Sequence, residues 1–181
     1  MVEAKIAPMS LQSKFNQVSL GGRNTQPLTP KQVSEVKAYS IVLGIPPNVL
    51  RFSDSMNTSY GNIFGTKILY VGCDVAPLAS PPVSGITANS RITIKACLAH
   101  EWIGHHNAEV VGCSFNRGSN AALSLVDVAL DEAQASIRAA RFAPNLEPTE
   151  RYTLCRDAIS RLKNQNLTIR QVRHLLYISQ P

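Results

Sequence analysis

Apolar residues at helical spacing predict a first helix over residues 30–43. Thr29 and Pro30 are typical of an N-cap and a first helical turn, and Val33, Val36 and Leu43 follow until Gly44 ends the pattern. Two later runs, residues 49–52 and 67–71, are short and rich in β-branched and aromatic side chains, which favour strands. We expect these runs to form a small sheet.

Between and after these runs the pattern is less regular. The stretch that holds Asn57, Gly61, Asn62 and Gly65 is typical of turns, and residues 75–90 contain three prolines without periodicity, as in a long loop that borders a site. Helices are then expected within residues 91–111 and over residues 120–142, 147–162 and 168–176. The order of elements predicts an α+β fold, with a small β-sheet followed by a mostly helical half.

Length and composition fit one folded domain. The chain has 181 residues, of which 44% are hydrophobic and 17% charged, so it can bury a core and is too apolar for disorder. Residues 1–28 are polar and aperiodic, which predicts a tail or junction, with a single domain over residues 29–181. The first twenty residues contain no signal-like apolar run, and no later run has the roughly 18 apolar residues of a membrane span.

The net charge of +6 is unevenly placed. Residues 1–132 carry ten Lys and Arg against nine Asp and Glu, whereas residues 133–181 carry eight against three. Because this excess falls on expected exposed faces of the C-terminal helices, we interpret it as a docking surface for an acidic partner or a solubilising surface. A nucleic-acid footprint is the less favoured interpretation.

Three of the four histidines fall in the run His100-Glu101-Trp102-Ile103-Gly104-His105-His106. The pattern is similar to H-E-x-x-H, in which two histidines one helical turn apart bind zinc and the glutamate is the general base. Here the spacing is one residue longer, and on a regular α-helix His100 and His105 would diverge by about 140°. A π-bulge, favoured by Gly104, would bring them together. A carboxylate at Glu101, among apolar neighbours, would also need a partner or a metal.

The helix over residues 120–142 offers a third metal ligand. Helical phase places Asp127 and Asp131 on a polar stripe with Gln134, Arg138 and Arg141, and directs Glu132 toward the core. Glu132 is therefore the expected ligand. Asp131 could accept a hydrogen bond from a ligating imidazole, whereas Asp127 is expected on a solvated face.

The run from His100 to His105 resembles the H-E-x-x-G-H zinc motif of the dipeptidyl peptidase III family. In that family a downstream acidic motif supplies the third ligand, and residues 131–136, Asp-Glu-Ala-Gln-Ala-Ser, are similar to a degenerate copy that again selects Glu132. Asp131, Gln134 and Ser136 depart from that motif. More broadly, the chain from Thr29 onward resembles the gluzincin-like metallopeptidase toxin domains of bacterial polymorphic (Rhs-type) secreted proteins.

This resemblance implies a zincin-like fold and a secreted effector that cleaves peptide bonds. It would be delivered by a secretion system or carrier polypeptide, act in a target-cell cytoplasm and have an immunity protein; otherwise the protein would be cytoplasmic. A protein or peptide substrate is expected, and neither a membrane nor nucleic acid is an expected partner. Zn²⁺ would be held by His100, His105 and Glu132, with Glu101 as the base.

Other assignments stay open. Tyr60, Tyr70 and His174 are candidates to stabilise a transition-state oxyanion, and residues 67–71 could be an edge strand that pairs with substrate. His106 could be a ligand, an outer hydrogen-bond donor or a surface residue. The first alternative function is an HNH-type nuclease, suggested by His105-His106-Asn107 but disfavoured because paired strands are not expected there. The second is a non-catalytic module with structural zinc, which would need a fourth ligand such as His106.

Overall fold

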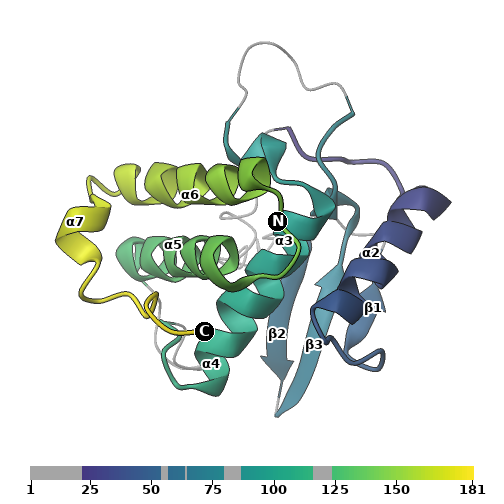
Figure 1. Ribbon diagram of the computed structural model, residues 1–181, viewed down its shortest axis with the longest axis horizontal. Coiled ribbons are helices and arrows are strands. Elements are labelled where there is room, and N and C mark those ends of the chain that lie inside the picture. The colour runs from purple at the N-terminus through teal and green to yellow at the C-terminus, as the bar shows by residue number, and fades with distance from the viewer. Residues whose placement is uncertain (1–21, 54–56, 64, 80–86, 116–123) are drawn as a thin grey trace, which may run out of the picture.

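The computed structural model confirms the α+β class. It describes residues 22–53, 57–63, 65–79, 87–115 and 124–181. Figure 1 shows a small sheet on one side, a long central helix crossing it, and two helices lying side by side on the other side. No helix in these described ranges is long and apolar enough to cross a membrane.

The sheet has three strands in the order β1-β3-β2. Strand β1 (Leu50–Phe52) pairs parallel with β3 (Thr66–Val71), and β2 (Ser59–Ile63) pairs antiparallel with β3. Strand β2 was not predicted, because Gly61 and Asn62 were interpreted as turn residues. Of the expected turn residues, Gly65 is at the β2–β3 connection, where its φ of 82° favours glycine.

The prediction of an edge strand over residues 67–71 is wrong. Strand β3 is the central strand of the sheet, paired with β2 along Thr66–Tyr70 and with β1 along Leu69–Val71. The edge strand nearest the central helix is β2, and it is tied to that helix. The backbone N–H of Tyr60 donates to Glu101, and the side chain of Asn62 donates to Glu109.

Helix α2 (Pro30–Val42) forms as expected, with a capping box between Thr29 and Gln32. After the short 3₁₀ turns η1 (Cys73–Val75) and η2 (Asn89–Arg91), the central helix runs without a break through α3 (Ile94–Ala99), η3 (His100–His106) and α4 (Asn107–Val110). Figure 1 shows this helix lying between the sheet and the helical half. It is therefore the element through which the two halves meet.

The helical half consists of α5 (Leu125–Phe142), α6 (Pro148–Lys163) and the short α7 (Ile169–Val172). Helices α5 and α6 lie side by side (Figure 1). The expected start of α5 near residue 120 lies outside the described residues, and Ser124 caps the helix as it stands. The last helix ends at Val172, earlier than the expected residue 176.

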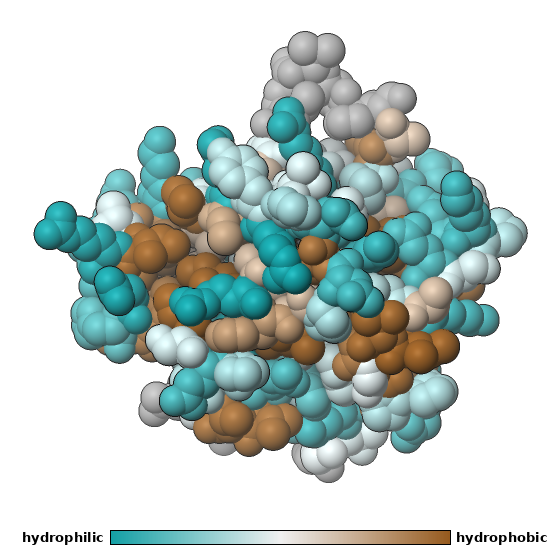
Figure 2. All heavy atoms as spheres, viewed as in Figure 1, coloured by the Kyte–Doolittle hydropathy of each residue, from teal (hydrophilic) through white to brown (hydrophobic). Residues whose placement is uncertain are grey.

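Two apolar clusters hold the fold together. The larger one joins α2, the sheet, α3 and the C-terminal part of α5, and the smaller one joins α5, α6 and α7 through residues such as Leu130, Leu162 and Val172. On the face shown in Figure 2, the apolar groups that reach the surface are separated by hydrophilic side chains. The sheet half and the helical half meet inside the molecule, where η3 packs on α5.

The folded region extends further toward the N-terminus than expected. Residues 22–28 fall in the predicted tail, yet the Arg23 side chain is buried and donates to the backbone carbonyls of Asp74, Val75, Asn89 and Ile92. Its guanidinium thus joins η1 to η2.

The polar stripe of α5 is not solvent-exposed as a whole. Gln134 and Arg138 are fully buried, because the chain after α7 folds back over them. Arg138 donates to the carbonyls of Tyr177 and Gln180, and Gln134 Oε1 accepts from the backbone N–H of Tyr177. Arg138 therefore contributes nothing to the expected basic surface.

Candidate metal centre

The central helix widens to a π-helix over His100–His106. Its backbone hydrogen bonds span five residues, as in the bond from Asn107 N to Trp102 O, so residues five apart share a face. The Nε2 atoms of His100 and His105 consequently lie 3.1 Å apart. The predicted π insertion is confirmed, and it brings the two imidazoles together.

Gly104 has a further role that the sequence did not indicate. It lies within the π-helix, whose backbone distortion it was expected to ease, and it also allows close packing of η3 on α5. A Cβ at this position would lie 2.7 Å from the Cα, Cβ and O of Ala135. Any larger residue would push η3 away from α5, the helix that carries Glu132.

Both imidazoles are held through their Nδ1 atoms. His105 Nδ1 lies 3.1 Å from Asp131 Oδ2, and His100 Nδ1 lies 3.0 Å from Ser136 Oγ. An Nδ1–H that donates to such a partner leaves the lone pair on Nε2, which is the arrangement of metal-ligating histidines. Two lone pairs that face one another at 3.1 Å repel unless a proton or a cation lies between them.

The Glu132 carboxylate borders both imidazoles. Its Oε2 lies 3.3 Å from His100 Nε2, and its Oε1 lies 3.7 Å from His105 Nε2. Oε2 also accepts from Arg161 on α6 at 2.9 Å. Although burial opposes ionisation, Arg161 and the two histidines hold the pKa of Glu132 well below its usual range. Glu132 is thus an anion at neutral pH.

Glu101 is the other carboxylate at this place. One ligand atom each from His100, Glu101 and His105 lie within 4.8 Å of one another, so these three residues form a group that could hold a metal ion. Glu101 Oε2 accepts from the backbone N–H of Tyr60 at 2.8 Å. Burial raises the pKa of Glu101, although His105 and His100 oppose that shift.

Charge balance favours a cation here. Glu132 and Asp131 contact the imidazoles directly, Asp157 reaches His100 through the Ser136 hydroxyl, and a ligand atom of Glu101 lies within 4.8 Å of those of both histidines. Arg161 pairs with two of these four carboxylates, Glu132 and Asp157. Burial lowers the pKa of His105, but its hydrogen bond to Asp131 and the charges of Glu132 and Glu101 outweigh burial and raise it to about 10. The same negative field that retains a proton on His105 would attract a metal cation.

Of the other sequence candidates, Asp131 lies where expected, on the His105 imidazole. It also accepts from Ser114 Oγ and from the backbone N–H of Phe115, so it ties the chain after α4 to α5. Asp127 instead caps α5 together with Ser124.

His106 faces the sheet. Its ring stacks on Trp102 with centroids 3.7 Å apart, contacts Tyr60 edge-on, and lies 3.1 Å from Lys67 Nζ through Nε2. Nδ1 meets Asn107 Oδ1 at 2.9 Å. With both ring nitrogens engaged in these contacts, His106 is not placed to complete the cluster around Glu132.

The three oxyanion candidates are dispersed. Tyr60 touches the group through its backbone, while its ring packs edge-on against Trp102. Tyr70 lies on β3 opposite Ser59. His174 is exposed and lines a hollow of about 290 Å³ together with Phe115 and Tyr177. None of the three side chains forms a hydrogen bond or ion pair with His100, Glu101 or His105.

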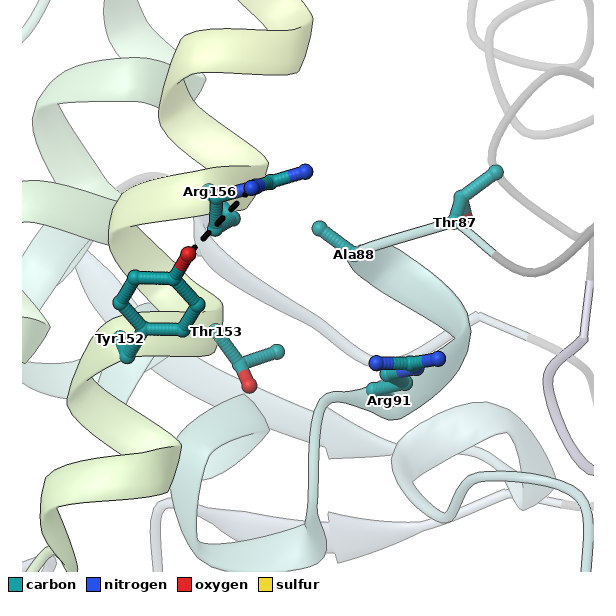
Figure 3. A pocket seen from close by; sticks show the side chains of 6 residues that line it. All are labelled: Thr87, Ala88, Arg91, Tyr152, Thr153 and Arg156. Atoms are coloured by element: carbon teal, nitrogen blue, oxygen red, sulfur yellow. Dashed lines mark hydrogen bonds between the residues drawn. The ribbon is translucent and has the colours of Figure 1, made fainter.

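A second hollow, of about 310 Å³, lies between η2 and α6 (Figure 3). Its lining includes Arg91, Tyr152 and Arg156, and Arg156 donates to the Tyr152 hydroxyl at 3.3 Å. Neither hollow is lined by His100, Glu101 or His105. The cluster is thus separate from these two surface hollows.

Sequence reasoning missed Ser136, Asp157 and Arg161. Ser136 had been noted only as a departure from the acidic motif, yet it lies four residues after Glu132 and so shares a helix face with it. Asp157 and Arg161 show the same i, i+4 spacing on α6 and form an ion pair at 2.7 Å. Those spacings were the available signals.

Comparison with known proteins identifies no relative. No protein-family model, no curated protein and no solved structure matches the chain.

Proposed function

We propose that this protein is a zinc-dependent hydrolase that cleaves peptide bonds. Zn²⁺ would be held by His100, His105 and Glu132, with Glu101 as the general base, on a zincin-like helical half. The observation that carries this proposal is the convergence of two Nε2 atoms 3.1 Å apart on the Glu132 carboxylate, with Glu101 beside them.

The donor set fits zinc. Two imidazoles and one carboxylate are a ligand combination of catalytic zinc sites, which keep one position for water. When bound, zinc supplies a Lewis acid that lowers the pKa of that water toward neutrality. Glu101 accepts the proton of the attacking water and delivers it to the leaving amine. The N–H of Tyr60 holds one Glu101 oxygen in place, which leaves the other free for this transfer.

One feature of the sheet favours the nuclease alternative. That alternative was disfavoured because no paired strands were expected, but β2 and β3 form an antiparallel pair, and β2 contacts η3. What favours the peptidase instead is the origin of the ligands. The proposed set comes from η3 and α5, and the strands supply no imidazole or carboxylate to it.

The alternative of a non-catalytic module with structural zinc needs a different fourth ligand from the one expected. Since His106 lies against Trp102, the candidate for a closing fourth ligand is Glu101. Glu101 is therefore either a base or a ligand, and one substitution separates the two roles.

The biological setting remains part of this proposal and rests on the resemblance to Rhs-type toxin domains. It comprises delivery by a secretion system or carrier, action in a target-cell cytoplasm, a protein or peptide substrate, and an immunity protein. The cationic side chains Arg141, Arg156, Lys163, Arg170 and Arg173 are exposed on or next to the C-terminal helices and would suit an acidic partner.

The Glu101→Gln variant tests the function. With Glu101 as base, hydrolysis of an unfolded protein such as casein should fall by at least about 10²-fold, the lower end of general-base contributions, while zinc content stays unchanged. Glu109→Gln, on the same helix, is the control and should keep both the hydrolytic activity and the zinc content of the parent protein. Loss of zinc from Glu101→Gln would make Glu101 a ligand and support the structural alternative. Nicking of plasmid DNA, with no proteolysis by the parent protein, would support the nuclease.

A further inference from the structure

We propose that Asp157, on α6, is the shared positioning residue of the metal centre. Through one carboxylate oxygen it orients two of the three proposed ligands, His100 by way of Ser136 and Glu132 by way of Arg161. This inference rests on the proposed metal centre and adds an anchor from a helix that supplies no ligand.

The first arm runs to His100. The Ser136 hydroxyl donates to Asp157 Oδ2 at 3.0 Å, and its oxygen lies 3.0 Å from His100 Nδ1. Ser136 is fully buried and Asp157 is 3% exposed, so water does not compete for these contacts. Since the hydroxyl proton is directed to Asp157, the serine oxygen must accept the Nδ1–H of His100. That fixes the His100 lone pair on Nε2.

The second arm runs to Glu132. Arg161 Nε donates to the same Oδ2 of Asp157 at 2.7 Å, and an Nη of Arg161 lies 2.9 Å from Glu132 Oε2. A guanidinium held by Asp157 has a fixed orientation. Arg161 then sets the position of one Glu132 oxygen, and the other, Oε1, lies nearest His105 Nε2.

Loss of Asp157 would disturb both arms. Without its counter-charge, Arg161 would pair with Glu132 alone and draw that carboxylate away from the imidazoles. Ser136 would be free to rotate, so His100 would lose its fixed tautomer. The third proposed ligand is independent, because Asp131 holds His105 directly.

The two arms should therefore be energetically coupled. Removing a partner that orients a metal ligand typically lowers metal affinity 10- to 100-fold. Because both arms end on one oxygen, breaking either should release part of what the other holds, and the combined loss should be smaller than the product of the separate losses.

The experiment measures zinc affinity by competition with a chromophoric chelator, and the visible absorption of the Co²⁺-loaded protein at saturation. We expect 10- to 100-fold weaker zinc binding in Ser136→Ala, Arg161→Gln and Asp157→Asn, with an altered Co²⁺ spectrum in each. The double variant Ser136→Ala/Arg161→Gln should weaken zinc binding by a smaller factor than the product of the factors measured for the two single variants. Arg156→Gln, an exposed arginine on α6, is the control and should match the parent protein.

The same measurements can overturn the proposed role of Asp157. Parental affinity and spectrum in Asp157→Asn, or a double variant whose losses simply multiply, would overturn the shared anchor while leaving the metal centre intact. If Asp157→Asn fails to fold, the two arm variants and their combination decide by the same criteria. Absence of zinc or Co²⁺ binding by the parent protein would instead refute the proposed function, and this inference with it.

Discussion

Burial and neighbouring carboxylates act in opposite directions on His105. Burial alone would favour the neutral ring, but Asp131, Glu132 and Glu101 prevail and raise the pKa to about 10. Without a metal, the imidazolium is therefore the main form at neutral pH, and a metal ion must displace that proton.

Metal affinity should consequently rise with pH. With one proton displaced from His105, we expect the zinc dissociation constant to fall about tenfold per pH unit from pH 6 to 9. Competition titrations at each pH, corrected for zinc hydrolysis, measure this slope. The His106→Gln variant should show the same slope, because His106 lies outside the cluster. An affinity independent of pH would contradict the assignment of His105.

The stability of the metal-free protein should instead fall as the pH rises. The folded pKa of His105, about 10, lies above its ordinary 6.5, so its protonation contributes stability that is fully present below pH 6.5. That contribution is lost as the pH rises toward 10. Urea unfolding at pH 7 and pH 9.5 should show the loss in the parent protein and a smaller one in His105→Asn. If the free energy of unfolding depended on pH equally in the two proteins, protonation of His105 would not be the stabilising event.

At this scale, spacing and residue type were sufficient to predict the group of His100, Glu101 and His105. The partners Ser136, Asp157 and Arg161 were not found, because which side chains face one another across α5 and α6 depends on packing. A sequence pattern orders residues on one helix, whereas it does not fix the contact between two.

Among the elements, the contact between η3 and α5 determines the site. The π-helix aligns His100 with His105, and the missing side chain at Gly104 lets α5 approach closely enough to place Glu132 beside them.

The Gly104→Ala substitution should therefore be costly. Its Cβ would meet Ala135 atoms at 2.7 Å, and overpacking of this kind costs about 1–3 kcal/mol. We expect that loss in urea unfolding, together with weaker zinc binding as Glu132 is displaced. Gly61→Ala, where no atom lies within 4 Å of the new Cβ, should change stability by less than about 1 kcal/mol. Parental stability in Gly104→Ala would show that the close approach is not required.

The elements also show where local patterns were sufficient. Helices α2 and α6 and strands β1 and β3 follow their predicted ranges closely, because capping residues and runs of β-formers act locally. Strand β2 was missed since Gly61 and Asn62 disfavour strands. It forms because its partner β3 supplies the ladder and Gly65 permits the connection.

Across the whole molecule, the chain after α7 acts as a cover for α5. Arg138, which is fully buried, bonds at the same time to the η3 carbonyl of Ile103 and to the carbonyls of Tyr177 and Gln180. This guanidinium joins the π-helix to the C-terminal segment. Helical phase placed it correctly on a polar stripe, but a segment forty residues away decides whether that stripe meets water.

Removal of residues 177–181 should thus destabilise the protein. Arg138 would lose two hydrogen bonds and Gln134 one. Bonds to charged groups contribute about 1.5–3 kcal/mol each, so we expect a loss of at least about 3 kcal/mol. Chemical denaturation of the truncated protein measures it. Removal of Pro181 alone keeps all three bonds and is the control. A truncated protein as stable as the control would show that the cover is dispensable.

The proposed metal centre holds one divalent ion between His100, His105 and Glu132. Metal analysis of the purified protein, after dialysis against zinc and removal of excess, tests this directly. It should give one zinc ion per chain in the parent protein and close to none in Glu132→Ala, with Asp127→Asn, on the same helix, unchanged. A parent protein without zinc would contradict the proposed metal centre, and a Glu132→Ala variant that retains a full equivalent of zinc would contradict the role of Glu132 as a ligand.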